Sequence, residues 1–342
     1  MDENNHILEV KNLRVSYHTY AGEVKAVRGV SFDLVRGQAL AIVGESGCGK
    51  SVTAKSIMGL IKKPQGEIKE DSEILYNNVN ILNYNKKEWQ AYKGGECAII
   101  FQDALAALNP TMRVGKQIME NLMAHKNMDK KSAQKEAVEM LRMVGIPEPE
   151  KRVKQYPHEF SGGMRQRVMI AIAFACDPKL LICDEPTTAL DVTIQSQILD
   201  IIKELQQKHN TSVIMITHDL GVVANIAQDI AVMYSGIIVE RGKSEDIFYR
   251  PRHPYTWALI ESVPRLDLTN KQKLASIPGI PPDLLNPPVG CPFCTRCKYC
   301  MPICKAQMPE LTDFGDGHTA ACWLHHPMAP AVEMPNLKGS AT

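Results

Sequence analysis

The sequence predicts an α/β protein in which a parallel β-sheet is followed by a segment rich in proline and cysteine. Between residues 179 and 239, apolar runs of strand length alternate with helical patterns, which is the rhythm of β-α-β units. A glycine-rich segment, GESGCGKS, stands between an apolar run and a helical pattern. After about Gly242, prolines become frequent and strand-like runs disappear. We therefore expect a sheet domain over residues 1–250 and an extension over residues 251–342.

Two kinds of element are expected before residue 179. Short runs rich in Val, Ile and aromatic residues predict strands at 7–15, 26–32, 38–43 and 97–101. A helical subdomain is expected over about 103–178. Within it, apolar residues recur at helical spacing, namely Ala133, Ala137, Met140, Leu141 and Val144.

The composition is that of a globular protein, and it gives no sign of nucleic-acid binding or of a membrane-spanning segment. Apolar residues make up 44% of the 342 residues and charged residues 23%, which is enough to build a full core. The formal net charge of +1 gives no indication of nucleic acid as a partner. No apolar run approaches the ~20 residues that cross a bilayer, and the N-terminus lacks the features of a signal peptide. We expect a cytosolic protein, and if it serves a membrane we expect it to do so by docking onto other chains.

The strongest chemical signal is the glycine-rich loop at residues 44–51. An apolar run before it and a helical pattern after it are the context that a phosphate-binding loop requires. Its glycines allow backbone N–H groups to surround phosphate oxygens, and the helix N-terminus adds positive potential. Lys50 is expected to reach the β- and γ-phosphates, and the Ser51 hydroxyl to bind Mg²⁺. The predicted ATP-binding residues here are Gly44, Glu45, Ser46, Gly47, Cys48, Gly49, Lys50 and Ser51.

Two carboxylates follow a second apolar run, in LLICDEP. Ligands of open α/β sheets bind at the carboxyl ends of the strands, so a strand over residues 180–183 would bring both acids to the ligand. Asp184 is expected to hold Mg²⁺, directly or through water. Glu185 is expected to orient and deprotonate the water that attacks the γ-phosphate.

A further anion site is predicted in FSGGMRQR, at residues 160–167. Ser161 is a suitable helix N-cap, and Gly162 and Gly163 lead into a helical pattern whose N-terminus would attract an anion. One chain that hydrolyses one ATP does not need two such sites. Two chains packed head to tail would use both, because each would close the nucleotide site of the other.

These three motifs resemble the Walker A, Walker B and signature motifs of ABC-transporter ATPases, and their order and gaps agree. The resemblance covers residues 7 to about 250 and implies the P-loop NTPase core of an ABC ATPase. One departure is mild, since Met164 stands where the commonest signature motif has Gln.

The same resemblance implies roles for residues outside the three motifs. Gln102 matches the Q-loop glutamine, which senses Mg²⁺ and the transmembrane subunit. Asp191 ends the D-loop match Ala189-Leu190-Asp191, and His218 matches the switch histidine at the γ-phosphate. Tyr17 stands where the family places an aromatic ring that stacks on adenine, with Tyr20 as the alternative.

The extension is similar to that of the ATPase subunits of dipeptide and oligopeptide importers, in RPRHPYTWALIESVP, IPGIPPDLLNPPVGCPF and the later RC and CWL. This resemblance implies a peptide substrate delivered by an external substrate-binding protein. It also implies two transmembrane permease subunits and a second ATPase subunit, usually a paralogue, at the cytoplasmic face of the cell membrane. Nickel, glutathione and sugar uptake stay open as alternatives.

The sequence disfavours two other function classes. A non-transport ABC ATPase of the DNA-repair or ribosome-associated class would show a long coiled-coil insertion or a second cassette, and this sequence has neither. A metal or redox sensor would explain the cysteines but would leave the ATP motifs without a purpose.

The ten cysteines fall into two groups. Four lie in apolar or glycine-rich segments and are expected to be buried apolar side chains: Cys48, Cys97, Cys176 and Cys183. Six lie between residues 291 and 322, where a cytosolic protein is not expected to form structural disulfides.

Two ligand sets can be drawn from the second group. The spacing of a bacterial ferredoxin run is matched by Cys294, Cys297, Cys300 and Cys304. The resemblance to peptide importers instead implies Cys291, Cys297, Cys304 and Cys322. We expect the second set to bind a 4Fe–4S cluster with a structural role. Zinc, which also takes four thiolates, and unligated thiols remain alternatives.

Overall fold

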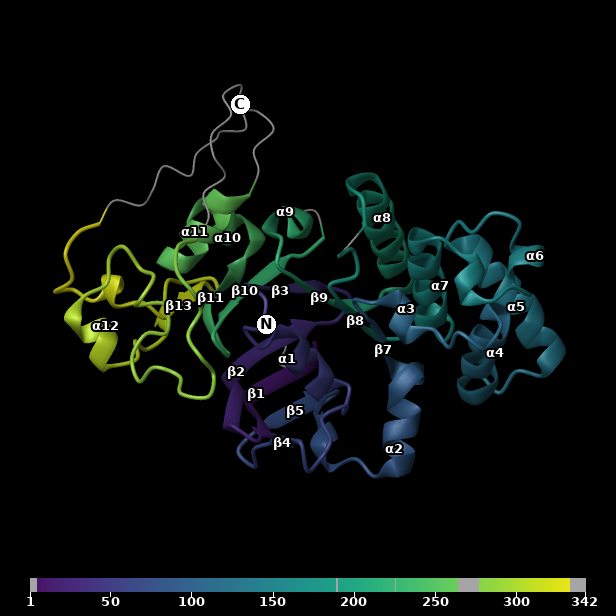
Figure 1. Cartoon of the computed structure of the whole chain (residues 1–342), viewed down its shortest axis with the longest axis horizontal. Coiled ribbons are helices and arrows are strands. Elements are labelled where there is room, and N and C mark those ends of the chain that lie inside the picture. The colour runs from purple at the N-terminus through teal and green to yellow at the C-terminus, as the bar shows by residue number, and fades with distance from the viewer. Residues whose placement is uncertain (1–4, 189, 225, 264–276, 333–342) are drawn as a thin grey trace, which may run out of the picture.

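Two β-sheets form the centre of the molecule (Figure 1). The computed structural model describes residues 5–332 except 189, 225 and 264–276. The larger sheet has eight strands in the order β12-β13-β11-β10-β3-β9-β8-β7, and the smaller one has the order β2-β1-β5-β6, with β4 paired to β1. The predicted α/β fold is confirmed.

The larger sheet is parallel through its middle. Its parallel strands are β7 (Cys97–Ile100), β8 (Leu180–Asp184), β9 (Ser212–Thr217), β3 (Ala39–Val43) and β10 (Asp229–Tyr234), and β11 (Ile237–Lys243) is antiparallel to β10. Every residue of β3, β8 and β9 is buried. Helices cover both faces of such a sheet, which is why these strands read as continuous apolar runs rather than as alternating patterns.

The smaller sheet is antiparallel and consists of β1 (His6–Thr19), β2 (Gly22–Val35), β4 (Gly66–Ile68), β5 (Glu73–Tyr76) and β6 (Val79–Asn80). The predicted strands at 7–15 and 26–32 are confirmed but are shorter than the observed ones. The two long strands extend to a hairpin around residues 20–21, where no apolar alternation marks their ends.

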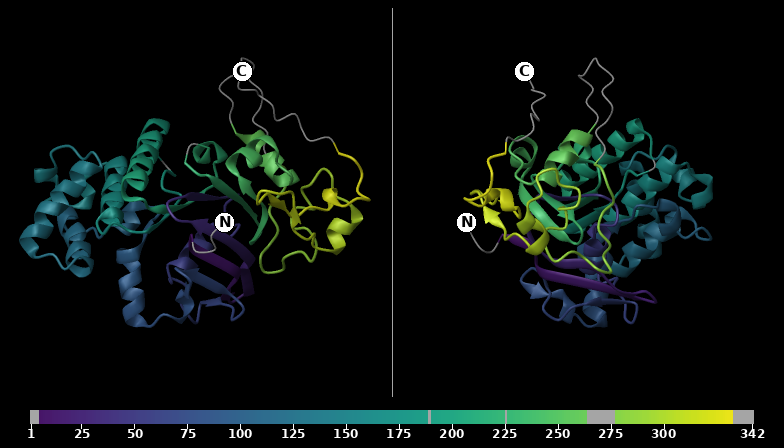
Figure 2. Two further views of the ribbon diagram at one scale, coloured as in Figure 1. Left: turned by 180° about the vertical axis from the view of Figure 1, so that it is seen from behind. Right: turned by 60° about the vertical axis from the view of Figure 1, so that its left-hand side comes forward.

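The helices lie around the larger sheet, and those between β7 and β8 gather at one end of the molecule (Figures 1 and 2). Seven helices precede β8 in the sequence: α1 (Lys50–Ile57), α2 (Lys86–Ala91), α3 (Ala104–Ala107), α4 (Val114–His125), α5 (Lys130–Met143), α6 (Pro149–Arg152) and α7 (Gly162–Phe174). The helices described after β8 are α8 (Val192–His209), α9 (Leu220–Val223), α10 (Ser244–Tyr249), α11 (Pro254–Ser262) and α12 (Pro302–Ala306). Single 3-10 turns occur at Ile81–Asn83, Pro157–Glu159 and Trp323–His325.

The residues predicted at helical spacing, from Ala133 to Val144, belong to α5 and to the C-cap residue that follows it. Asp129 begins α5, because its side chain accepts hydrogen bonds from the N–H groups of Lys131 and Ser132. A short polar acid before a helix satisfies N–H groups that have no partner within the helix. The five residues predicted at helical spacing are all buried.

The extension is joined to the sheet rather than appended to it. Its strands β12 (Thr312–Asp313) and β13 (Thr319–Ala320) pair with each other, and β13 pairs with β11 through Glu240 and Arg241. The extension therefore contains short strands, although strand-like runs disappear from the sequence after about residue 242. Each of these strands has only two residues, too few to leave a periodic pattern in the sequence.

No helix in the described part of the chain is long and apolar enough to span a bilayer. Three of the four cysteines predicted to be buried apolar side chains are so, and Cys176 is half-buried.

Candidate functional site

The glycine-rich loop lies between β3 and α1 in close contact with β10. A Cβ atom on Gly44 would stand 2.1 Å from the carbonyl oxygen of Met233. Gly49 has a φ of +106°, a backbone conformation that side chains rarely adopt, and a Cβ there would stand 2.5 Å from the carbonyl oxygen of Ala26. These two glycines are thus required by packing and by backbone conformation.

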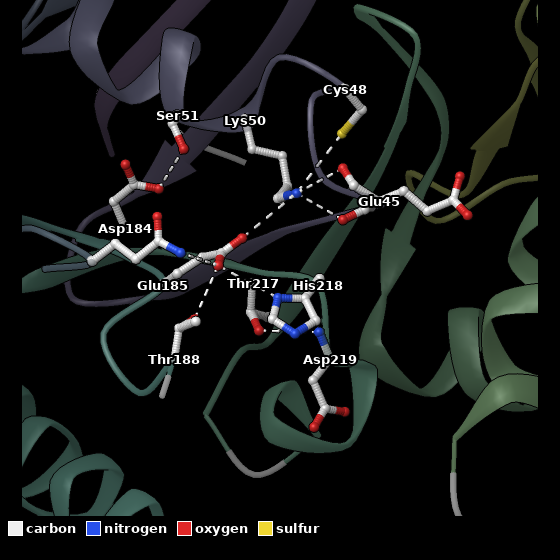
Figure 3. Close-up of polar contacts among 12 residues, drawn as sticks. Glu45, Cys48, Lys50, Ser51, Asp184, Glu185, Thr188, Thr217, His218 and Asp219 are labelled. Carbon is white, nitrogen blue, oxygen red and sulfur yellow. Dashed lines mark hydrogen bonds and ion pairs between the residues drawn. The ribbon is translucent and has the colours of Figure 1, made fainter. Parts of the chain in front are cut away.

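The Lys50 side chain is held inside the loop. Its Nζ donates to the carbonyl oxygens of Gly44 at 2.7 Å and Glu45 at 2.9 Å, and it lies 3.9 Å from a carboxylate oxygen of Glu185 (Figure 3). The side chain is only 4% exposed. Phosphate oxygens could replace the two carbonyl oxygens as acceptors for the Lys50 ammonium. The ammonium therefore lies where it could bind a polyphosphate held by the loop.

Ser51 and Asp184 meet at the carboxyl end of β8. The Ser51 hydroxyl donates to Asp184 Oδ1 at 2.7 Å. Burial raises the pKa of Asp184 from its ordinary value, although the Ser51 hydrogen bond opposes the shift. A cation beside this carboxylate would favour its charged form. A hydroxyl and a carboxylate are oxygen ligands of the kind that Mg²⁺ takes together with substrate phosphates, so the pair fits a nucleotide-bound Mg²⁺.

Glu185 lies at the centre of the predicted catalytic residues. Its Oε2 accepts from Gln102 Nε2 at 3.0 Å and from the Thr188 hydroxyl at 2.9 Å, and His218 Nδ1 is 3.5 Å away (Figure 3). Gln102 follows β7 and His218 follows β9, so three adjacent strands deliver these groups. Thr188 is not predicted from the sequence, because a threonine in a turn carries no signal of its own.

The backbone at Glu185 turns sharply. Its φ is +49°, and its N–H donates to the carbonyl oxygen of Ile216 on β9 at 2.9 Å. A non-glycine residue with positive φ is uncommon and costs free energy of about 1 kcal/mol or more. The hydrogen bond to β9 and those of the side chain hold the residue in this conformation.

The second predicted anion site lies at the start of α7. Ser161 caps this helix by accepting from the Met164 N–H at 3.4 Å. Within the described residues, no hydrogen bond joins Ser161, Gly162 or Gly163 to the glycine-rich loop. Helix α7 is instead linked to the turn that follows Glu185. Gln166 of this helix donates from Nε2 to the carbonyl oxygen of Pro186 at 2.5 Å.

The remaining predicted ATP-site residues lie on separate elements. Asp191 is the N-cap of α8 and accepts from the Ile194 N–H at 2.9 Å. Tyr17 is half-buried on β1, with its ring against Gly66, and burial raises its pKa. Tyr20 is fully exposed at the hairpin between β1 and β2. Ala189 of the D-loop match lies outside the described residues.

Five of the six clustered cysteines line one small pocket: Cys291, Cys294, Cys297, Cys304 and Cys322. This includes the whole set implied by the peptide importers, whereas Cys300 of the ferredoxin-type set is not on the pocket wall. Burial raises the pKa of Cys291 and of Cys322 to about 12, so these thiols are neutral without a cation.

The same pocket holds an unpaired donor. His253 lines it, accepts at Nδ1 from the Tyr255 N–H, and has no hydrogen-bond partner for its buried Nε2 among the described residues. A buried unpaired donor beside thiols fits a site for a sulfur-bound metal group, because it could donate to sulfur.

Within the described part of the chain, however, no group of three or more His, Cys, Asp or Glu side chains is close enough together to hold a metal ion. The thiols therefore surround a pocket without converging at ligand distance. The expected iron–sulfur cluster is not supported by this geometry.

Comparison with known proteins gives two family matches. Residues 27–188 match the family described as "ABC transporter", and residues 239–304 match "Oligopeptide/dipeptide transporter, C-terminal region". The chain is 57% identical to the oligopeptide transport ATP-binding protein OppD of Bacillus subtilis, over 96% of this chain and 92% of the relative. It is 56% identical to the dipeptide transport ATP-binding protein DppD of the same organism, over 93% of this chain and 94% of the relative.

Two solved structures have similar folds. One is a dimeric post-hydrolysis state of the ATP-binding cassette MJ0796 with ADP and phosphate bound, at 26% identity and a TM-score of 0.62, covering 69% of this chain and 98% of that one. The other is cbiO1 from Clostridium perfringens, part of an ABC transporter complex, at 27% identity and a TM-score of 0.61, covering 72% of this chain and 92% of that one.

Proposed function

The chain belongs to the ABC transporter family as an ATP-hydrolysing subunit of a peptide importer, and we propose that its ATP site is formed by the residues gathered around Glu185. In this proposal the loop 44–51 surrounds the phosphates, and Lys50 exchanges its carbonyl partners for phosphate oxygens. Glu185 holds and deprotonates the attacking water, and His218 contacts the γ-phosphate.

The observation that carries this proposal is the convergence of Lys50, Gln102, Thr188 and His218 on one carboxylate. Oriented donors around a carboxylate fix the direction of its free lone pairs, which is what a water-activating base requires. Ser51, Gln102 and Asp184 would hold Mg²⁺, which supplies charge neutralisation of the phosphates when it is bound.

We propose a head-to-tail pair of ATPase subunits. Ser161, Gly162 and Gly163 of one subunit would close the nucleotide on the loop of the other. Two observations support this: the start of α7 has no hydrogen bond to its own loop within the described residues, and the similar cassette MJ0796 was solved as a dimer. The partner is proposed to be a paralogue, as the resemblance to peptide importers implies.

The remaining partners are two permease subunits and an external substrate-binding protein, at the cytoplasmic face of the membrane. Permease docking is proposed beside Gln102, where Asp103 caps the short helix α3 and Leu105 is exposed. A hydrogen bond from Gln102 to Glu185 would connect this surface with the catalytic carboxylate.

The substrate is tested by ATPase stimulation of the assembled transporter. We expect turnover to rise when the binding protein is loaded with di- or oligopeptides and to stay at the basal level with Ni²⁺, glutathione or sugar. The same complex carrying Glu185→Gln supplies the background. Stimulation by one of the other substrates but not by peptides would contradict peptide import.

We also propose that Cys291, Cys297, Cys304 and Cys322 hold a 4Fe–4S cluster that cross-links the extension. The proposal starts from the pocket that these thiols line and the unpaired Nε2 of His253, and it requires the thiols to move closer together than they lie among the described residues. A metal centre can stabilise a segment whose apolar core is small, and its role here would be structural.

This cluster is tested by metal content. Anaerobically purified protein should contain iron and sulfide and lose both in Cys322→Ser, because one of four ligands is removed. Cys300→Ser is the matched control and should keep them, since Cys300 is not on the pocket wall. Zinc in place of iron, or neither metal, would contradict the proposal, and loss in Cys300→Ser would favour the ferredoxin-type set.

A further inference from the structure

The extension contacts the glycine-rich loop directly, at Glu45. The Glu45 carboxylate points away from Lys50, toward the C-terminal segment (Figure 3). Arg296 of the extension binds both of its oxygens through two nitrogens of the guanidinium, one at 2.9 Å. The Tyr255 hydroxyl accepts from the Glu45 N–H at 2.8 Å. Both the side chain and the backbone of this loop residue are thus held by residues that follow the ATPase core in sequence.

Arg296 is fixed by further hydrogen bonds on its remaining donors. Its Nε donates to the carbonyl oxygen of Pro278 at 2.9 Å, and Nη2 also donates to that of Ile277 at 3.1 Å. Nη1 also donates to the Tyr234 hydroxyl at 3.2 Å. The side chain is only 3% exposed. A planar guanidinium with all five N–H groups used is a rigid partner for a carboxylate.

Arg296 lies within the cysteine-rich turn, which we define as residues 291–304. The carbonyl oxygen of Phe293 accepts from the N–H groups of both Arg296 and Cys297, each at 3.0 Å. The Phe293 ring packs against the rings of Tyr234 and Tyr255, with centroids 5.3 Å apart in both cases. The position of the guanidinium therefore depends on the fold of the turn that carries the thiols.

Glu45 is also connected to the phosphate-binding side of the loop. Its carbonyl oxygen accepts from Lys50 Nζ, the group expected to reach the phosphates. The Glu45 carboxylate is 27% exposed, and without a cation beside it, it would repel a triphosphate bound to the same loop. Arg296 removes this repulsion and holds the loop in one conformation.

We propose that Arg296 is a positioning residue for ATP, through which the cysteine-rich extension forms part of the phosphate site. The proposal rests on the assignment of ATP to the loop 44–51. It predicts an effect on nucleotide affinity rather than on the chemical step, because Arg296 touches the loop and not the water-activating carboxylate. The extension then contributes to ATP binding, in addition to pairing with the edge strand β11 of the larger sheet.

The test is ATP affinity of the full chain, with turnover measured in the assembled transporter. Arg296→Gln should raise the Kd and KM for ATP about tenfold, the scale of a charge-assisted bidentate contact, while kcat at saturating ATP stays close to wild type. Glu45→Gln should raise the Kd less than Arg296→Gln does, since it weakens the hold of Arg296 on the loop but also removes the negative charge that would repel the phosphates. The double variant should resemble Glu45→Gln, so the second substitution rescues the first.

Arg252→Gln is the matched control, because this extension arginine lies over the Phe314 ring and not at the loop. It should bind ATP as the wild type does. An unchanged Kd in Arg296→Gln, or an equal loss in Arg252→Gln, would overturn the inference, as would a lowered kcat with no rescue in the double variant. If the wild-type chain failed to bind ATP, the proposed function itself would be wrong.

Discussion

Glu185→Gln is expected to abolish steady-state ATP hydrolysis while ATP binding persists. The glutamine has nearly the same shape and can still accept from Gln102 and Thr188, but it cannot take a proton from water. Loss of a general base lowers a rate by about 10²–10⁴-fold. Lys50 loses an ionic partner at 3.9 Å but keeps its two hydrogen bonds within the loop, so nucleotide affinity should stay near that of the wild type. The measurement is turnover beside equilibrium binding of ATP with Mg²⁺.

Asp184→Asn separates this role from that of the neighbouring carboxylate. Asp184 contacts Ser51 and not the predicted water position, so its loss should weaken Mg²⁺-dependent ATP binding. Glu185→Gln is therefore expected to lower turnover, and Asp184→Asn to weaken Mg²⁺-dependent ATP binding. Near-normal hydrolysis in Glu185→Gln would remove Glu185 from the role of base.

Ser161→Arg is expected to disable hydrolysis at the loop of the partner subunit rather than at its own. The substitution removes the cap of α7 and places a large cation where the proposal puts the partner's γ-phosphate. Ser161→Thr keeps a capping hydroxyl and is the matched control, because cap loss by itself costs about 0.5–2 kcal/mol of stability.

Complementation in the assembled pair distinguishes the two arrangements. If the sites are shared, Ser161→Arg in this chain combined with a substituted loop lysine in the partner leaves one working site. Ser161→Arg combined with Lys50→Met in this same chain leaves none. If Ser161 instead served its own loop, the two results would be exchanged, and that exchange would contradict the head-to-tail pair.

Much of the fold and the chemistry of the loop could be predicted because they depend on local pattern. The apolar runs of β3, β8 and β9 are buried on both faces, so their composition alone marks them as strands of a parallel sheet. The carboxyl ends of adjacent parallel strands meet at one edge of the sheet. The sequence could therefore place Asp184, Glu185 and His218 near one ligand before any distance was known.

Other parts of the site have no local signal. Thr188 supports Glu185 only because the turn after β8 folds back, and the positive φ of Glu185 arises from its hydrogen bond to β9. The two-residue strand β13 pairs with the edge of β11, and β12 in turn pairs with β13. None of these features repeats with a period that a sequence could display.

The sequence by itself determined that this chain has an α/β core, a phosphate-binding loop before a helix, and carboxylates at a strand end. The loop and the strand end are each encoded within about ten consecutive residues, and the core is encoded in the alternation of patterns over residues 179–239. Only the tertiary structure decided that the extension reaches that loop. Arg296 and Glu45 are 251 residues apart, and each reads as an ordinary charged residue in its own segment. Their pairing depends on how the cysteine-rich turn packs against Tyr234 and Tyr255, because contacts at such separation are set by packing and not by neighbouring residues.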